Sequence, residues 1–102
     1  MAKVITKLSK PAEADIIGIE DKYSEAAAEK RIKAIFQRID DLEQFPLRGR
    51  PIPELNDLNV RQIDVFKEFR LIYHVVDEYF LIILRIFPYW KPLNPDEDLT
   101  FE

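Results

Sequence analysis

A segment rich in proline, glycine and arginine, residues 45–55, divides this 102-residue chain into two halves with different hydrophobic patterns. Before it, apolar residues recur at every third or fourth position, which is the spacing of amphipathic helices. After it, branched and aromatic residues fill three short runs, which is typical of β-strands. Helices followed by strands predict an α+β fold, in which the helices cover one face of one small sheet.

The half before the loop predicts one strand and two helices. Residues 2–8 alternate apolar and polar side chains and suit an opening strand at an edge of the sheet. Ser9 can cap a first helix, whose first turn tolerates Pro11, and Ser24 can cap a second helix. The very short connection between the two helices predicts a helical hairpin.

The half after the loop predicts an antiparallel three-stranded meander. Its strands are expected at residues 60–66, 69–76 and 79–87, with two-residue turns between them. Such turns fix the pairing along both hairpins and place residue 70 opposite residue 85. The face covered by the helices is then expected to hold Phe66, Phe69, Leu71, Tyr73, Val75, Phe80, Ile82, Leu84 and Ile86.

The same pairing predicts a cationic opposite face. Arg70 would lie directly opposite Arg85, with Arg61 and His74 paired further along. Like charges at directly opposite positions destabilise a sheet unless an anion relieves them. Alternatively, both arginines extend past the isoleucines into solvent and bind nothing. The relieving anion could belong to an acidic partner protein, to nucleic-acid phosphates, or to the preceding loop, at Glu54 or Asp57.

Composition excludes several classes of site. The chain has no cysteine and one histidine, so disulfides, thiolate metal sites and a cysteine nucleophile are excluded, and we expect no metal and no cofactor. The net charge of −4 disfavours nonspecific nucleic-acid binding. No apolar run is long enough to span a bilayer and no signal peptide is recognised, so we expect a cytoplasmic protein.

One domain is expected over residues 1–91, followed by an acidic tail over residues 92–102. The tail contains two prolines, four acidic side chains and no basic one. Such a composition predicts an extended or mobile segment.

Several features follow one another along the chain: the loop, a strand that opens with Val60-Arg61, a run from Phe69 to Val75, and a hydrophobic strand with Arg85 near its end. This order resembles the RelE/ParE superfamily of bacterial toxins from type II toxin-antitoxin systems. The resemblance covers nearly the whole chain and implies a RelE/ParE-like fold. Such toxins block growth until a cognate antitoxin neutralises them, so the resemblance also implies an antitoxin partner and allows a hetero-oligomer of the two.

One branch of this superfamily cleaves mRNA on the ribosome, and another poisons DNA gyrase. The chain is more similar to the ParE-like branch, because Asp64 stands where the cleaving branch carries the second arginine of an Arg-x-Arg-Val strand start. Pro88 likewise stands where many members carry a late histidine. The resemblance therefore implies a toxin that binds a target such as DNA gyrase and has no catalytic activity of its own.

The resemblance also implies candidate site residues. Binding of the target or the antitoxin is expected at Arg48, Arg50, Arg61, Arg70, Arg85 and Trp90. If the chain is instead a RelE-like, ribosome-dependent mRNA endonuclease, the chemistry falls to Arg61, Arg70, His74, Arg85 and Tyr89. A third alternative is a degenerate member that retains antitoxin binding only. For the aromatic pair after the last strand, packing at a core edge or contact with a protein is favoured over stacking on a base.

Overall fold

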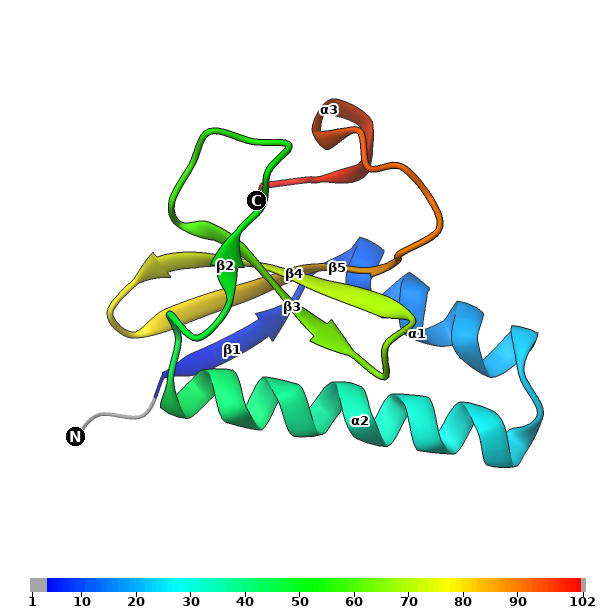
Figure 1. Cartoon of the computed structure of the whole chain (residues 1–102). Coiled ribbons are helices and arrows are strands. Elements are labelled where there is room, and N and C mark those ends of the chain that lie inside the picture. The colour runs from blue at the N-terminus through cyan, green and yellow to red at the C-terminus, as the bar shows by residue number, and fades with distance from the viewer. Residues whose placement is uncertain (1–3, 102) are drawn as a thin grey trace.

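The computed structural model describes residues 4–101, which form a sheet with two long helices on one face and a short helix beyond the other (Figure 1). The sheet has five strands in the order β1-β5-β4-β3-β2, of which β1 is parallel to β5 and the other neighbours are antiparallel. This confirms the predicted α+β fold and adds a short fifth strand. In chain order the elements are β1 (Ile5–Leu8), α1 (Lys10–Lys22), α2 (Glu25–Gln44), β2 (Arg50–Pro51), β3 (Val60–Val65), β4 (Phe69–Asp77), β5 (Phe80–Pro88) and α3 (Pro95–Asp98).

Capping serines begin both long helices, as predicted. The hydroxyl of Ser9 accepts from the amide of Ala12 at 3.1 Å and donates to the carbonyl of Leu84 at 2.9 Å. The hydroxyl of Ser24 accepts from the amide of Ala27 at 3.3 Å. Each serine supplies an acceptor that the first turn of a helix lacks, and Ser9 also fastens α1 to β5.

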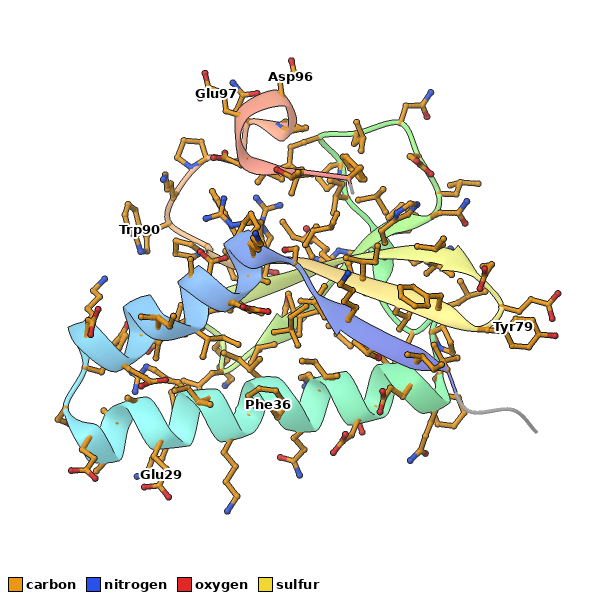
Figure 2. All side chains as sticks on the ribbon, turned by 180° about the vertical axis from the view of Figure 1, so that it is seen from behind. Glu29, Phe36, Tyr79, Trp90, Asp96 and Glu97 are labelled. Atoms are coloured by element: carbon orange, nitrogen blue, oxygen red, sulfur yellow. The ribbon has the colours of Figure 1, made fainter. Side chains whose placement is uncertain are left out.

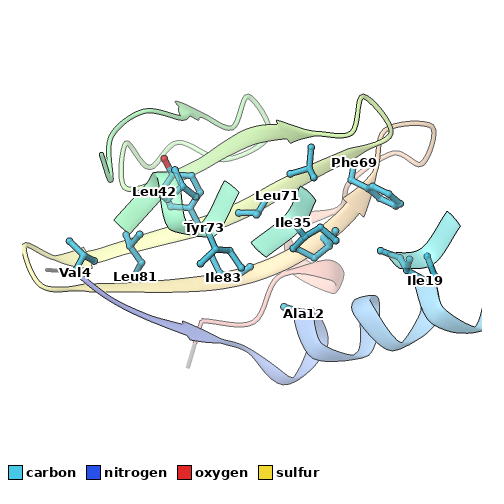
Figure 3. Packing of buried hydrophobic residues seen from close by; sticks show 14 residues of the cluster. Val4, Ala12, Ile19, Ile35, Leu42, Phe69, Leu71, Tyr73, Leu81 and Ile83 are labelled. Atoms are coloured by element: carbon cyan, nitrogen blue, oxygen red, sulfur yellow. The ribbon is translucent and has the colours of Figure 1, made fainter. Parts of the chain in front are cut away.

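The main core lies between the helical hairpin and the sheet (Figure 3). Ile35 and Leu42 of α2 are fully buried there, together with Leu71 of β4 and Ile83 of β5. Burying an aliphatic side chain of this size contributes about 1.5–3 kcal/mol. This cluster holds the helices on one face of the sheet, as the hydrophobic pattern predicts.

The turn between β3 and β4 is longer than predicted. Val65 pairs with Phe69, which leaves residues 66–68 as the connection. Phe66 and Lys67 have φ values of 56° and 57°, in the left-handed region that favours glycine. Neither residue type signals this conformation, which is why the sequence predicted a two-residue turn.

The pairing of the second hairpin differs from the prediction at its turn and at two irregularities. Asp77 pairs with Phe80, so the turn falls at residues 78–79, and the register shifts at Val76 of β4 and at Leu84 of β5. Ile72 lies opposite Arg85, whereas Tyr73 lies opposite Ile83, so Leu84 has no partner on the β4 ladder. The carbonyl of the unpaired Leu84 accepts a hydrogen bond from the hydroxyl of Ser9, the cap of α1. An inserted residue also reverses the face of every side chain on one side of it.

The altered pairing overturns the predicted cationic face. Arg70 lies opposite Phe87 and Arg61 lies opposite Tyr73, so the predicted pairs of Arg70 with Arg85 and of Arg61 with His74 are both wrong. Phe66, predicted to face the helices, lies exposed in the turn. The helix-facing cluster contains, as predicted, Phe69, Leu71, Tyr73, Val75 and Ile86; it contains Leu81 and Ile83 in place of Ile82 and Leu84.

A second apolar cluster covers the far face of the sheet. Ile72, Leu84 and Phe87 are fully buried in it, packed with Leu93 and Leu99 of the C-terminal segment. The tail that we expected to be extended is therefore folded back over the sheet (Figure 1). That prediction relied on the prolines and acidic residues and overlooked the two leucines, which bury enough apolar surface to anchor the segment.

Candidate functional site

Arg70 is buried in the far face of the sheet and is paired with a carboxylate of the loop. Its Nη1 donates to both carboxylate oxygens of Glu54, at 3.1 and 2.9 Å, and to Oε1 of Gln62 at 2.9 Å. Arg70 is 6% exposed. Glu54 is one of the anions considered from the sequence. A buried charge paired in this way fastens the loop to the sheet rather than facing a ligand.

Arg85 joins α1 and the C-terminal segment to β5. Its Nε and Nη2 donate to the carboxylate of Asp15 at 2.8 and 2.9 Å, and its Nη1 donates to the carbonyl of Asp98 at 3.0 Å. The hydrogen bond to Asp15 raises the pKa of Arg85, so the guanidinium stays charged. The same carboxylate accepts from the amide of Ile86 at 2.9 Å, beyond the end of β1. Sequence reasoning missed Asp15, although an acidic residue on the apolar stripe of a helix is a signal of such a pair.

The 45–55 loop is held against the sheet by hydrogen bonds that involve Arg61, Gly49 and Tyr73. Nη1 of Arg61 donates to the carbonyl of Gly49 at 2.8 Å, and the amide of Gly49 donates to the hydroxyl of Tyr73 at 2.9 Å. That hydroxyl donates to the carbonyl of Pro46 at 2.8 Å, and burial raises the pKa of Tyr73. A Cβ atom at Gly49 would lie 2.6 Å from the Tyr73 hydroxyl, so glycine is required there. Arg61 therefore has a structural role in this loop.

Arg48 and Arg50 lie at a solvent-open hollow of about 280 Å³, here named the arginine hollow, which Arg38 of α2 also lines. Short β2 pairs with the start of β3 alone, so residues 63–65 form an open strand edge in the described part of the chain. Arg38 donates to a carbonyl of that edge at 3.1 Å. Arg48 lies 3.9 Å from the carboxylate of Asp41. Three guanidinium groups thus surround one hollow beside an open edge of the sheet.

The residues predicted for RNA cleavage do not assemble into an acid–base site. His74 packs edge to face against Phe101, with ring centroids 5.6 Å apart. The Tyr89 hydroxyl donates to Asp64, and burial together with this hydrogen bond raises the pKa of Tyr89, so the phenol stays protonated. Between residues 4 and 101, no hydrogen bond joins either side chain to Arg61, Arg70 or Arg85.

Trp90 follows β5 and is 75% exposed. Its indole borders a groove between α1 and the end of β5, with Nζ of Lys22 at 5.9 Å from the ring centroid. Figure 2 shows the side chain projecting outward beside α1. Two roles were favoured for Trp90, and the first, packing at a core edge, therefore does not occur. The second, contact with a protein partner, stays a prediction.

Residues 4–101 contain no group of three or more His, Asp or Glu side chains arranged to hold a metal ion. None of the helices in this range has the length and hydropathy needed to cross a membrane.

Comparison with known proteins identifies the family. The family model described as "ParE toxin of type II toxin-antitoxin system, parDE" matches residues 6–88, from β1 to the end of β5. The chain belongs to this ParE toxin family. Among solved structures, a chain titled "Chromosomal ParDE TA system from P. aeruginosa" has the same fold, with a TM-score of 0.67 and 23% identity over 84% of this chain and 96% of that one. No curated protein matches the chain.

Membership of the ParE toxin family confirms the RelE/ParE resemblance and the ParE-like branch. The chain is a ParE-type toxin of a type II toxin-antitoxin system. The family match ends at Pro88, so Tyr89, Trp90 and the C-terminal segment lie outside it. These residues are features of this chain beyond what the ParE family model describes.

Proposed function

We propose that this ParE-family toxin inhibits growth in the cytoplasm by binding DNA gyrase, and that a cognate antitoxin neutralises it by forming a complex with it. The similar structure from P. aeruginosa is a ParDE system, which supports an antitoxin partner for this chain. The family match supports the gyrase-directed branch over the RNA-cleaving one.

The engagement of the sheet arginines within the fold carries the proposal. Arg61, Arg70 and Arg85 all donate to groups of the chain itself. Cleavage of a phosphodiester needs a proton acceptor, a proton donor and a cation free to reach the phosphate. The arrangement of the described residues therefore favours binding over ribonuclease chemistry.

The arginine hollow is the surface that best suits the target. Its guanidinium groups line an open concavity, and a planar guanidinium matches carboxylates well. The ion pairs that Arg38 and Arg48 make with Asp41 are long, at 3.4 and 3.9 Å, and partly exposed, so they contribute little to stability and exchange readily for a ligand. An acidic surface of the target protein would fit here.

The test is to induce the chain in bacteria without antitoxin and to follow DNA integrity and translation together. We expect an SOS response and stabilised gyrase cleavage complexes while translation continues. Rapid loss of translation with codon-phased mRNA cuts would refute the gyrase proposal and favour the ribosome-dependent nuclease. If neither effect appears and the chain still binds its antitoxin, it is a degenerate family member.

Charge reversal tests the arginine hollow. Arg48→Glu with Arg50→Glu should weaken inhibition of purified gyrase by about tenfold or more, with little change in melting temperature, because both side chains are exposed. The matched control is Lys30→Glu with Lys33→Glu, which makes the same charge change at exposed positions of α2. Equal inhibition by both double variants would contradict a role for the hollow.

A further inference from the structure

A second hollow, here named the Trp90 groove, lies between α1 and the end of β5 and has a volume of about 520 Å³. Buried apolar side chains line it, with aromatic side chains and lysines around them: Ile19 and Phe69, Tyr89 and Trp90, Lys22 and Lys67. Concave apolar sites with exposed aromatic walls are where a partner protein inserts an anchoring side chain. Figure 2 shows Trp90 at this end of the molecule, opposite Tyr79 at the other.

Gly18 lines the Trp90 groove from the middle of α1. A glycine inside a helix costs about 1 kcal/mol relative to alanine. The fold does not require it, because a Cβ atom at Gly18 would have no neighbour within 4 Å and the residue has no positive φ. The absent side chain leaves space in the groove for a side chain that approaches α1 from outside.

The charges around the groove are unequal. Asp15 is neutralised by Arg85 and Glu68 by Arg31, each at 2.8 Å. Lys22 and Lys67 make no ion pair with any residue between 4 and 101. The groove therefore presents an apolar interior and a net positive rim, which complements an apolar side chain flanked by carboxylates.

The backbone beside the groove is closed to an added strand. The amide of Ile86, at the edge of β5 beyond β1, already donates to Asp15 at 2.9 Å. Pro88 has no amide hydrogen, so the next outward position offers no donor either. An occupant must bind through its side chains, as an amphipathic helix does when it lies in an apolar groove.

We propose that the Trp90 groove is the docking site for an acidic amphipathic helix of the cognate antitoxin, which inserts an apolar side chain between Gly18 and Trp90. This inference rests on the antitoxin partner proposed above. A nucleic acid would need more cations than the two lysines, and a symmetric contact with a second copy would bring those lysines together.

The single tryptophan of the chain makes docking directly observable. Full-length chain labelled with 5-fluorotryptophan gives one ¹⁹F resonance, which reports on Trp90 alone. Adding the unlabelled product of the gene adjacent to that of this chain should shift the resonance and reduce its exposure to solvent. Calorimetry on the same samples measures the affinity. If calorimetry detects no binding to the unaltered chain, the antitoxin part of the proposed function fails, and this inference fails with it.

Variants then separate docking from folding. Trp90→Ala and Lys22→Glu with Lys67→Glu should each weaken antitoxin binding by about tenfold or more. Tyr79→Ala, an exposed aromatic at the far turn, and Lys30→Glu with Lys33→Glu are the matched controls and should bind within about twofold.

Gly18 gives the sharpest contrast. Gly18→Ala should raise the melting temperature by roughly 4 °C or more, because alanine favours the helix. Gly18→Leu should leave the fold stable and weaken antitoxin binding by about tenfold or more, since its side chain fills the groove. The docking proposal would be refuted if the antitoxin binds without shifting the ¹⁹F resonance and its affinity changes less than twofold with Gly18→Leu and with Trp90→Ala. The proposal of an antitoxin partner would then still stand.

Discussion

Asp15 fastens α1 to β5, and its removal should destabilise the fold strongly. The carboxylate accepts two hydrogen bonds from Arg85 and one from the amide of Ile86, and the side chains of the ion pair are 16% and 19% exposed. Removing one partner of a fully buried ion pair costs about 3–5 kcal/mol. Arg85 keeps the Asp98 carbonyl at 3.0 Å and remains partly solvated, so we expect Asp15→Ala to cost about 2–4 kcal/mol.

Urea unfolding followed by circular dichroism measures this loss of stability. In a domain of this size, Asp15→Ala should also lower the melting temperature by about 10 °C or more. Glu20→Ala, at an exposed position of the same helix, is the control and should stay within about 0.5 kcal/mol of the unaltered chain. Adding Arg85→Met to Asp15→Ala removes the uncompensated charge and should recover part of the loss. A loss below about 1 kcal/mol for Asp15→Ala would refute the claim that this pair fastens α1 to the sheet.

Three further predictions concern the loop, the tail and the response to acid. Gly49→Ala should destabilise the fold by about 1–3 kcal/mol, because the Cβ atom would lie 2.6 Å from the Tyr73 hydroxyl; an unchanged urea midpoint would contradict the close approach. Leu99→Ala should cost about 2–3 kcal/mol by urea unfolding if the tail is folded on the sheet, and nothing if it is loose. The hydrogen bond from Arg31 lowers the pKa of Glu68, so this carboxylate stabilises the fold above its unfolded pKa of about 4.3, and the contribution is lost as the pH falls through the folded pKa. The urea midpoint of Glu68→Gln should therefore lie below that of the unaltered chain at pH 7, and the two should converge in acid; a difference that persists in acid would point to another cause.

Local signals account for the parts of the fold that could be predicted. The capping serines and the helical stripe act within a few residues, so both helices and the three long strands follow from the pattern. The register of the first hairpin does not, because it depends on Phe66 and Lys67, which adopt positive φ without being glycine. The register of the second hairpin depends on a turn at residues 78–79 and on shifts at Val76 and Leu84. No local sequence signal marks the bulge at Leu84 either. The Leu84 carbonyl accepts from the hydroxyl of Ser9, the cap of α1, and this contact is distant in sequence.

The site was harder to predict because its charge pairs are distant in sequence. Asp15 and Arg85 are 70 positions apart, whereas Glu54 lies 16 positions before Arg70 in a loop that the sequence already singled out. Only the second pair was among the candidates considered. Like-charge repulsion was a sound reason to expect a nearby anion, but it could not tell a carboxylate of the chain from one of a partner.

This difference determines which substitutions can report on function. Arg70 is 6% exposed, so its replacement by glutamate would bury a second carboxylate beside Glu54. The same replacement at Arg85 would place a carboxylate beside Asp15. Either variant would lose activity by unfolding, whatever surface the toxin uses, because an unpaired buried charge costs several kcal/mol. Arg48, Arg50 and Trp90 are exposed, so their variants stay folded, and a loss of gyrase inhibition or antitoxin binding there can be assigned to the contact itself.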